Sequence, residues 1–362
     1  MKEFPLPKSK RTILPFWVSL ILAITFVVTG VIVTSFAYLS LNAFINRPLN
    51  PLAEAAEAVI ELELTPMPQE GLAPVPTVGE GQPTPTLIPT TEPSEPSERV
   101  NVLLMGIDRR PGEPFISRTD TMMLMSIDPV NDTASMLSIP RDLYVVVPGR
   151  GRDRINTAFV YGSAGNNPAG GAQLAMQAVE YNLGVPIHHY LLVDFSAVIG
   201  GIDAIGGIDL YVPYNIYDPT FPDMNYGFDP LYIEAGQQHL DGTTALKYAR
   251  TRHQDNDFYR ASRQQQVVLA VRDKILGLGF AEMMRQAPGM YQQLDQGIRT
   301  DLSLDEIVRL ATAAAGIPSE NIRNEVLDQN YVSNYITPTG ASVLVPINET
   351  ISPLVQEMFY SQ

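Results

Sequence analysis

The run TMMLMSIDPVNDTASMLSI, residues 121–139, contains two short apolar segments separated by the turn-like sequence PVND. Apolar segments of this length with turn residues between them are typical of a β-hairpin whose strands are buried. A similar run, NVLLMGI at residues 101–107, precedes the hairpin and predicts a third buried strand. The globular part of the chain is therefore predicted to begin with three strands that are buried on both faces.

Further strand-like and helix-like patterns follow along the chain. In chain order, we predict a helix over 170–184 that ends at a glycine, strands over 188–195 and 207–213, a helix from Asp257 to Leu276 with Asp257 as its N-cap, helices over about 280–296 and 303–315, two short strands, and a closing helix over 350–360. Strands mixed with helices predict an α/β fold class, a sheet covered by helices with some antiparallel pairing.

The N-terminal region has a different composition. No charged residue occurs from Thr12 to Asn46, and this apolar stretch is long enough to span a bilayer with some tilt. Lys2, Lys8, Lys10 and Arg11 precede it, which places that end in the cytoplasm. A cleaved signal peptide, the alternative, would have a shorter apolar region. We predict a cytoplasmic tail over 1–12, one transmembrane helix over 13–41 and a single-pass protein of the cell membrane.

Residues 42–98 are predicted to form a stalk and linker. The segment 65–98 contains nine prolines and almost no large apolar residue, so it cannot bury enough surface to fold. Residues 99–362, with a core over 99–276, are predicted to form one extracytoplasmic domain.

Charge and composition exclude several classes of protein. The chain has a formal net charge of -15 at pH 7, which repels nucleic acid, and its predicted cytoplasmic part is too short to read DNA. A transcription regulator is therefore excluded. There is no cysteine, and we find no HExxH, GxSxG or P-loop sequence, which argues against a zinc hydrolase and a Ser-His-Asp enzyme.

One stretch of this acidic chain is basic. RTRHQDNDFYRASR, residues 250–263, contains four of the 24 Lys and Arg residues. Arg260 and Arg263 would lie in the first turn of the helix that begins near Asp257, where a cation is unfavourable unless an anion is bound. A phosphate there would gain from the guanidinium groups and from free helix amides. Alternatively, Asp255, Asp257 and Asp301 pair with these arginines, and both interpretations stay open.

Charged pairs also stand where the predicted strands begin or end. They are Asp108 with Arg109, Arg118 with Asp120, and Arg141 with Asp142. Ligands of α/β proteins bind at this edge of the sheet, although a single such charge is more often an ordinary loop residue. Three pairs at successive strand ends favour a binding site.

Seven blocks in a fixed order show a resemblance to a known family. They are NVLLMGID, RTDTMMLMSID, SIPRDLYV, RINTAFVYG, HHYLLVDF, DAIGGIDLYVP and HLDGTTALKYARTRHQDNDFYRASRQQQ. The chain resembles the LytR-CpsA-Psr family, membrane-anchored bacterial enzymes that attach glycopolymers to the cell wall. The resemblance covers roughly residues 99–276.

The resemblance implies a three-layer α/β/α sandwich with a mixed central sheet. It implies a hydrophobic tunnel for the polyprenyl tail of a polyprenyl-pyrophosphate-linked glycan, with arginines at the tunnel mouth. The implied reaction is a phosphotransfer in which the glycosyl phosphate moves to a hydroxyl group of peptidoglycan and polyprenyl phosphate leaves.

The resemblance also implies roles for individual residues. The metal ligands would be Asp108 and Asp120, holding Mg²⁺, with Mn²⁺ as a possible replacement. The catalytic residues would be Arg118, Arg141, Asp142, Arg252, Asp257 and Arg260. The residues around the pyrophosphate would be Arg109, Arg118, Arg141, Arg154, Asn156, Arg250, Arg252, Arg260, Arg263 and Gln264. The chain departs from the family pattern at Arg154, where a lysine is usual, and at Phe159, where a tyrosine is usual.

Two other functions use the same pocket. One is a non-catalytic carrier of polyprenyl lipid or glycan, which would not require Asp108 and Asp120. The other is a pyrophosphatase that releases polyprenyl phosphate and passes the glycan to water.

Overall fold

The computed structural model describes residues 99–109, 113–223, 227–252, 256–294 and 297–360. The predicted tail 1–12, transmembrane helix 13–41 and linker 42–98 lie outside these residues. Within the described ranges, no helix combines the length and the apolar character that a membrane span requires.

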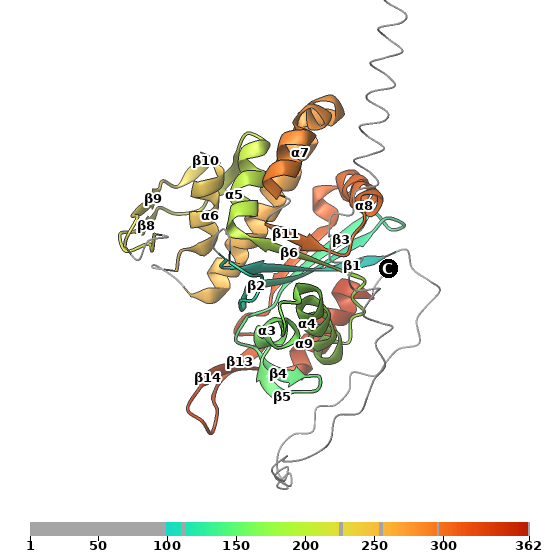
Figure 1. Cartoon of the computed structure of the whole chain (residues 1–362), viewed down its shortest axis with the longest axis vertical. Helices are drawn as coiled ribbons and strands as arrows, with labels where there is room; N and C mark the ends of the chain where they lie inside the picture. The colour runs from blue at the N-terminus through green and yellow to red at the C-terminus, as the bar shows by residue number, and fades with distance from the viewer. Residues whose placement is uncertain (1–98, 110–112, 224–226, 253–255, 295–296, 361–362) are drawn as a thin grey trace, which may run out of the picture. The chain divides into compact units, whose positions relative to one another are not determined.

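A six-stranded sheet forms the centre of the described domain (Figure 1). Its strands, in spatial order, are β11 (Ile298–Thr300), β6 (His189–Asp194), β1 (Val100–Ile107), β2 (Thr119–Asp128), β3 (Thr133–Ser138) and β12 (Ile322–Val326). The β1–β6 and β3–β12 pairs are parallel and the other three are antiparallel, so the sheet is mixed as predicted. The β2–β3 hairpin is confirmed, with Asp128 opposite Thr133.

Helices cover both faces of this sheet. On one face lie α3 (Thr157–Gly162), α4 (Pro168–Leu183) and α9 (Asn348–Phe359), and on the other lie α5 (Phe195–Ala204), α7 (Asp257–Leu294) and α8 (Leu304–Gly316) (Figure 1). The alternation of side chains along β1 explains both layers. Leu103, Met105 and Ile107 join the apolar cluster of α3, α4 and α9, while Val102 packs with Leu310 of α8.

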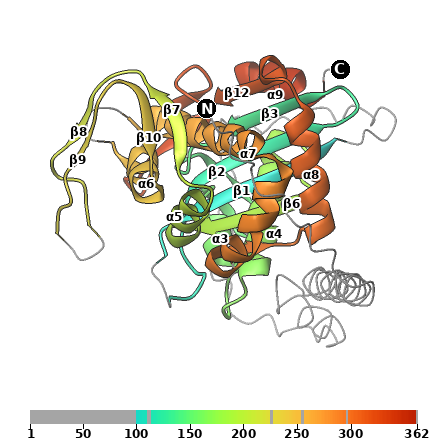
Figure 2. The ribbon, with the colours of Figure 1, turned by 90° about the horizontal axis from the view of Figure 1, so that it is seen from above.

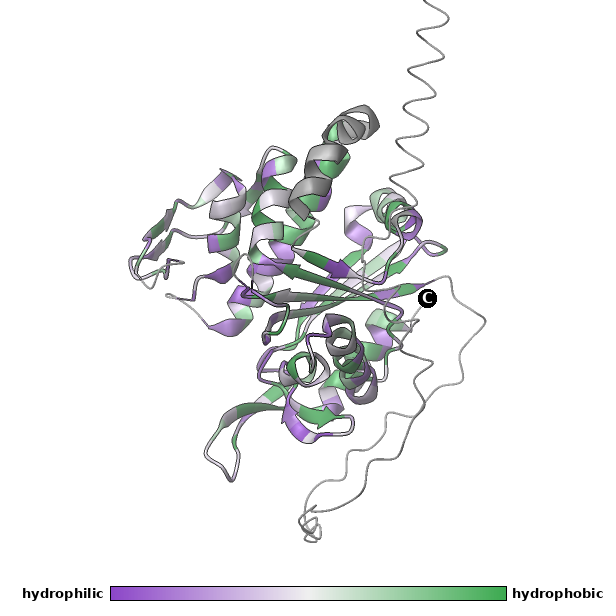
Figure 3. Ribbon diagram, viewed as in Figure 1, coloured by the Kyte–Doolittle hydropathy of each residue, from purple (hydrophilic) through white to green (hydrophobic). Residues whose placement is uncertain are grey.

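A second apolar cluster lies beside the sheet, among α5, α6 (Gly242–Arg250) and α7. A two-stranded ribbon covers these helices. It consists of β7 (Ile208–Val212) paired with β10 (Gly236–Leu240), and β8 (Ile216–Asp218) paired with β9 (Leu231–Ile233). Figure 2 shows the ribbon extending outward beside α6. The strands of the central sheet are mostly hydrophobic, whereas the outer parts of the fold alternate between hydrophobic and hydrophilic (Figure 3).

Several predicted elements are confirmed and others are corrected. Helix α4 ends at Gly184, whose φ of 71° suits glycine, and α8 begins with a capping box between Ser303 and Glu306. The two helices predicted over 257–276 and 280–296 are one helix, α7, because the glycines at 277 and 279 do not interrupt it. Three strands rather than two precede α9: β12, β13 (Val332–Ile336) and β14 (Ser342–Pro346). The hairpin of β4 (Tyr144–Val147) and β5 (Gly151–Arg154) and the short helix η1 (Ser319–Asn321) were not predicted.

The N-cap of α7 is Asn256, not Asp257. The side-chain Oδ1 of Asn256 accepts hydrogen bonds from the amides of Phe258 (2.9 Å) and Tyr259 (3.2 Å). These amides are therefore not free for an anion, which corrects the prediction from the sequence. The correction leaves the carboxylate of Asp257 available to the arginines around it.

Candidate functional site

A pocket of about 340 Å³ opens where β1 ends and β2 begins. Asp108 directly follows β1 and Asp120 is the second residue of β2, and the antiparallel pairing of these strands brings the two carboxylates to the same edge. The loop after β8, the C-terminal end of α6 and the first turns of α7 complete the walls. The lining residues are Asp108, Asp120, Thr121, Phe195, Asp218, Thr220, Phe221, Pro222, Arg250, Thr251, Arg252, Arg260 and Gln264.

A second, much smaller cavity of about 10 Å³ adjoins the pocket. It shares Asp120, Thr121, Arg260 and Gln264 with the pocket, and adds Arg141 and Asp257. This space holds about one water molecule, whereas the pocket is large enough for many. The tunnel for an isoprenoid tail stays a prediction.

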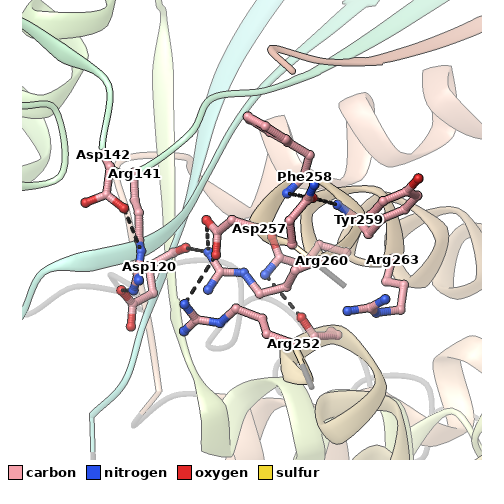
Figure 4. A network of polar contacts seen from close by, with 12 residues as sticks. Asp120, Arg141, Asp142, Arg252, Asp257, Phe258, Tyr259, Arg260 and Arg263 are labelled. Carbon is pink, nitrogen blue, oxygen red and sulfur yellow. Dashed lines mark hydrogen bonds and ion pairs between the residues drawn. The ribbon is translucent and has the colours of Figure 1, made fainter. Parts of the chain in front are cut away.

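Arg260 lies at the centre of the site (Figure 4). Its guanidinium group is buried, and Nη2 donates to the backbone oxygen of Asp120 (3.0 Å) and to Oδ2 of Asp257 (2.9 Å). Burial lowers the pKa of Arg260 to about 10, although the nearby Asp257 opposes the shift. The side chain therefore still carries its charge at neutral pH. Its Nε has no hydrogen-bond partner among the described residues.

Arg141 holds the opposite side of Asp120. Its Nη1 lies 2.6 Å from Oδ1 of Asp120, and its Nε lies 3.5 Å from Oδ2 of Asp142 (Figure 4). Burial acts to lower the pKa of Arg141, but the hydrogen bond and charge of Asp120 outweigh it and raise the pKa. Asp142 also pairs with Nε of Arg154 at 3.0 Å, so a chain of charges leads away from the pocket.

Arg250 and Arg252 enter the pocket from the end of α6. Nη2 of Arg250 lies 3.6 Å from Oδ2 of Asp108, and its guanidinium group stacks 4.1 Å above the ring of Phe195. Burial is the main cause that lowers the pKa of Arg250. Arg252 is the most accessible of the pocket arginines, with 44% of its side chain exposed, and its Nη1 lies 3.3 Å from Oδ1 of Asp257.

The two cavities are formally neutral in charge. Their lining contains four arginines (Arg141, Arg250, Arg252, Arg260) and four aspartates (Asp108, Asp120, Asp218, Asp257). An anionic ligand must therefore displace aspartates from these ion pairs, or a cation must first neutralise some of the carboxylates.

Two predicted ligand-binding arginines serve the fold instead. Arg109 is buried, donates through Nε (2.9 Å) and Nη2 (2.6 Å) to Asp194, the N-cap of α5, and stacks on Phe115. Arg263 is buried and donates to the backbone oxygens of Tyr248 (2.9 Å) and Thr251. A buried guanidinium group needs such acceptors, and in both residues the group turns to them rather than to the pocket.

Of the remaining predicted residues, Gln264 lines the pocket and the other three lie outside its lining. Arg118 is exposed and makes no hydrogen bond or ion pair with the described residues. Arg154 pairs with Asp142 and donates through Nη2 to the backbone oxygen of Ser342 (2.8 Å). Asn156 is buried, and no described residue donates to its Oδ1. Gln264 lines both cavities, and its Nε2 lies 3.3 Å from the backbone oxygen of Ala249.

The alternative pairing proposed from the sequence is partly confirmed. Asp257 pairs with both Arg252 and Arg260. Asp301 instead accepts a hydrogen bond from the amide of Tyr190 (2.9 Å), and Asp255 lies outside the described residues.

Sequence reasoning missed the wall formed after β8. Asp218 is buried and accepts from the hydroxyl of Thr251 (2.7 Å), and Thr220, Phe221 and Pro222 follow it in the lining. The signal was the sequence DPTFP, in which an acidic residue ends a strand just before a proline-containing turn.

The residues present fit a hard divalent cation bound together with phosphate. Among the described residues, no three His, Cys, Asp or Glu side chains form a group that could hold a metal ion. Asp108 and Asp120 nevertheless share the pocket, and Oδ2 of Asp120 accepts no hydrogen bond from the described residues. Mg²⁺ is usually held by one or two carboxylates plus substrate phosphate oxygens, so this donor set suits it.

Comparison with known proteins identifies the family. The model of the LytR_cpsA_psr family matches residues 76–358, so the chain belongs to this family. The chain is 35% identical over 263 residues to a protein of Oceanobacillus iheyensis named polyisoprenyl-teichoic acid--peptidoglycan teichoic acid transferase TagU. The match spans 72% of this chain and 75% of that protein.

Solved structures agree with this assignment. TagT bound to LI-WTA is 26% identical, with a TM-score of 0.57 over 72% of this chain and 89% of that chain. TagV of B. subtilis is 27% identical, with a TM-score of 0.57 over 74% of this chain and 99% of that chain.

Proposed function

We propose that this protein is a membrane-anchored phosphotransferase that moves a glycopolymer phosphate from a polyprenyl-pyrophosphate carrier to peptidoglycan. The observation that carries the proposal is the convergence of Arg250, Arg252 and Arg260 with Asp108 and Asp120 on one pocket. The name of the Oceanobacillus iheyensis relative describes the same class of transfer.

The arginines would bind the pyrophosphate of the donor. Arg252 is accessible in the pocket, Arg141 lines the adjoining smaller cavity, and Arg260 lines both. Guanidinium groups bind phosphate oxygens in a bidentate way and neutralise charge that develops during transfer. The ring of Phe195 beneath Arg250 holds that guanidinium group in place while Asp108 turns to other partners.

Asp108 and Asp120 would hold Mg²⁺, or Mn²⁺, in this proposal. When bound, such an ion supplies positive charge that neutralises phosphate oxygens. It also resolves the charge balance of the site, because two of the four aspartates then cease to compete with the donor for the arginines.

The reaction requires one bond to form and one to break. A peptidoglycan hydroxyl oxygen attacks the sugar-linked phosphorus, the bridging P–O bond breaks, and polyprenyl phosphate leaves with that oxygen. The hydroxyl proton passes to a base. Of the two candidates, Asp257 lines the smaller cavity, whereas Asp142 pairs with Arg141 and Arg154 outside both linings, so we assign this role to Asp257.

The transmembrane helix over 13–41 completes the proposal. It would hold the domain on the outer side of the membrane that contains the lipid donor, with the N-terminus in the cytoplasm. Fractionation of cells that express the full chain, followed by protease treatment of intact protoplasts, tests this arrangement. Digestion of the 99–362 domain is expected, and its protection would contradict the orientation.

The central experiment uses the full-length protein with a polyprenyl-pyrophosphate oligosaccharide, peptidoglycan fragments and Mg²⁺. We expect glycan phosphate on peptidoglycan, loss of this product with Arg252→Ala, and full activity with Arg309→Ala, an exposed arginine on α8. Free glycan phosphate in solution would identify a pyrophosphatase instead. Donor binding without any product would identify a carrier, and either result would contradict our proposal.

A further inference from the structure

The ribbon of β7, β8, β9 and β10 has one buried face and one exposed face. Ile208, Leu210, Val212, Ile216 and Ile233 all point into the apolar cluster of α5, α6 and α7. The residues between them therefore point away from the protein.

Three tyrosines lie on this outer face. Tyr211 on β7, Tyr217 on β8 and Tyr232 on β9 are 64%, 53% and 59% exposed, and Tyr217 is directly opposite Tyr232 in the strand register. The registers of the two strand pairs differ by one residue, and Gly236, with a φ of 109°, lies at the junction. This extra residue keeps the exposed positions of β9 and β10 on the same face of the ribbon.

Such a face indicates a binding surface. Seven of the 33 residues from 208 to 240 are aromatic, although aromatic residues form only 8% of the chain. Several exposed aromatic rings that lie side by side on one face indicate an interaction site rather than ordinary surface. Exposed polar groups of Asp209, Gln237 and His239 continue the same face. Aromatic faces beside hydrogen-bonding groups match a sugar ring, which has C–H bonds on its faces and hydroxyl groups at its rim.

The outer face and the wall of the candidate site lie on opposite sides of the same strand, β8. Tyr217 immediately precedes Asp218, whose carboxylate belongs to the pocket lining, and the chain then supplies Thr220 and Phe221 to the same wall. A polymer lying on the outer face of β8 and β9 would reach the pocket by passing around the turn that contains Thr220 and Phe221.

The charge of the ribbon determines which polymers can bind to it. Residues 208–240 contain five acidic residues and no lysine or arginine. Asp209 pairs with Lys274, Asp229 pairs with Lys247 and Asp218 faces the pocket, so the ribbon is far from strongly anionic. The ribbon nevertheless offers no lysine or arginine of its own to attract polyphosphate polymers or anionic lipid head groups. It tolerates a sugar backbone without phosphate.

We propose that the outer face of the ribbon binds the glycan strand of peptidoglycan, the acceptor, and leads it to the pocket. This inference rests on the proposed function for the identity of the acceptor. Tyr217 and Tyr232 stack on consecutive sugars, and Tyr211 extends the platform along β7.

The test measures binding of the full-length protein, in detergent micelles, to insoluble peptidoglycan stripped of attached polymers. We expect Tyr217→Ala with Tyr232→Ala to weaken binding by about tenfold or more. The paired change to phenylalanine keeps the rings and should bind nearly as the unchanged protein does. Tyr181→Ala on α4, 49% exposed on the opposite layer, is the matched control and should have no effect.

The outcomes separate this inference from the proposed function. Loss of binding in the double alanine variant, with an unchanged thermal shift on addition of a polyprenyl pyrophosphate, supports the inference even if no transfer is detected. Unchanged binding to peptidoglycan overturns it, as does weaker binding only to a polyphosphate glycopolymer or to phosphatidylglycerol vesicles. If the double variant does not fold, Tyr211→Ala alone must still weaken binding severalfold, and no weakening contradicts the inference.

Discussion

The two ends of β2 carry the same kind of ion pair and use it differently. At one end Asp120 pairs with Arg141 at 2.6 Å, and at the other Asp128 pairs with Arg99 at 2.9 Å. Asp128 is buried and also accepts from the amides of Val130 and Asn131 and from the side chain of Asn131. Asp120 is 36% exposed in the pocket, with one oxygen unused by the described residues. The two carboxylates therefore differ in their second oxygen, which the protein occupies at Asp128 and leaves open toward the pocket at Asp120.

The largest effect should come from Asp120→Asn. The change keeps the shape of the side chain but removes the charge that Arg141 and the proposed Mg²⁺ require, so transfer should fall by about a thousandfold. Because the residue is partly exposed, the free energy of unfolding should change by less than about 1 kcal/mol. Initial rates and thermal unfolding of the same preparation check both expectations. Retained activity would remove Asp120 from the site.

The second comparison lies within the basic stretch. Arg252→Ala should reduce transfer about a hundredfold without loss of stability, because this side chain is accessible and, among the described residues, pairs only with Asp257 at the rim of the candidate site. Arg263→Ala should instead lower the melting temperature, because it leaves the backbone oxygens of Tyr248 and Thr251 without their buried donor. The reverse pattern would show that the roles of the two arginines are exchanged.

Asp128→Asn tests the structural end of β2. We expect a loss of about 2–3 kcal/mol in the free energy of unfolding at pH 7, with activity per folded molecule retained. Burial opposes ionisation of Asp128, but Asn131, Arg99 and Val130 outweigh it and lower its pKa below the ordinary value of 3.8. The unfolded state therefore binds the proton first, and stability is lost as the pH falls from about 3.8 through the folded-state pKa.

Urea unfolding of Asp128→Asn and the unchanged protein between pH 7 and pH 3 measures this effect. The difference between the two proteins should be constant above about pH 4.5 and should shrink below pH 3.8. A constant difference over the whole range would mean that the charge of Asp128 contributes nothing.

The smallest effect concerns the start of α7. Asn256→Ala should cost about 1 kcal/mol in the free energy of unfolding, because the amides of Phe258 and Tyr259 lose their acceptor. Asp257→Asn keeps a side-chain oxygen that can accept from the buried Arg260, so it should leave this stability nearly unchanged and should reduce transfer instead. Equal destabilisation by both changes would restore Asp257 as the cap.

The sequence predicted the parts of the fold that depend on local pattern. The β2–β3 hairpin follows from apolar runs around PVND, and α4 follows from helical spacing and the glycine at 184. The sequence predicted β7 but missed the other three strands of the ribbon. These strands are short, and the residues that begin β9 and β10 do not alternate clearly between apolar and polar. The continuity of α7 was missed because glycine weakens a helix without ending it when the helix continues on both sides.

The site was predictable as a set of charges but not as a geometry. The sequence identified Arg141, Arg250, Arg252 and Arg260 as candidates, and the structure brings them to two adjoining cavities. It could not separate them from Arg109 and Arg263, because only packing decides which guanidinium group meets Asp194 or a backbone oxygen. Asp218 was missed because its neighbour in space, Thr251, is 33 residues away in the chain.

The equal numbers of arginines and aspartates around the pocket have a consequence for selectivity. A surplus of guanidinium groups would be occupied by whichever small anion is most abundant in the surroundings, such as inorganic phosphate. In this protein a single small anion gains little by binding, because each arginine must break its ion pair with an aspartate before it can pair with the anion. Only a ligand that offers several charged oxygens at once, and brings its own counter-cation, can reorganise all four arginines together. Under the proposed function, common small anions should therefore inhibit the protein only weakly.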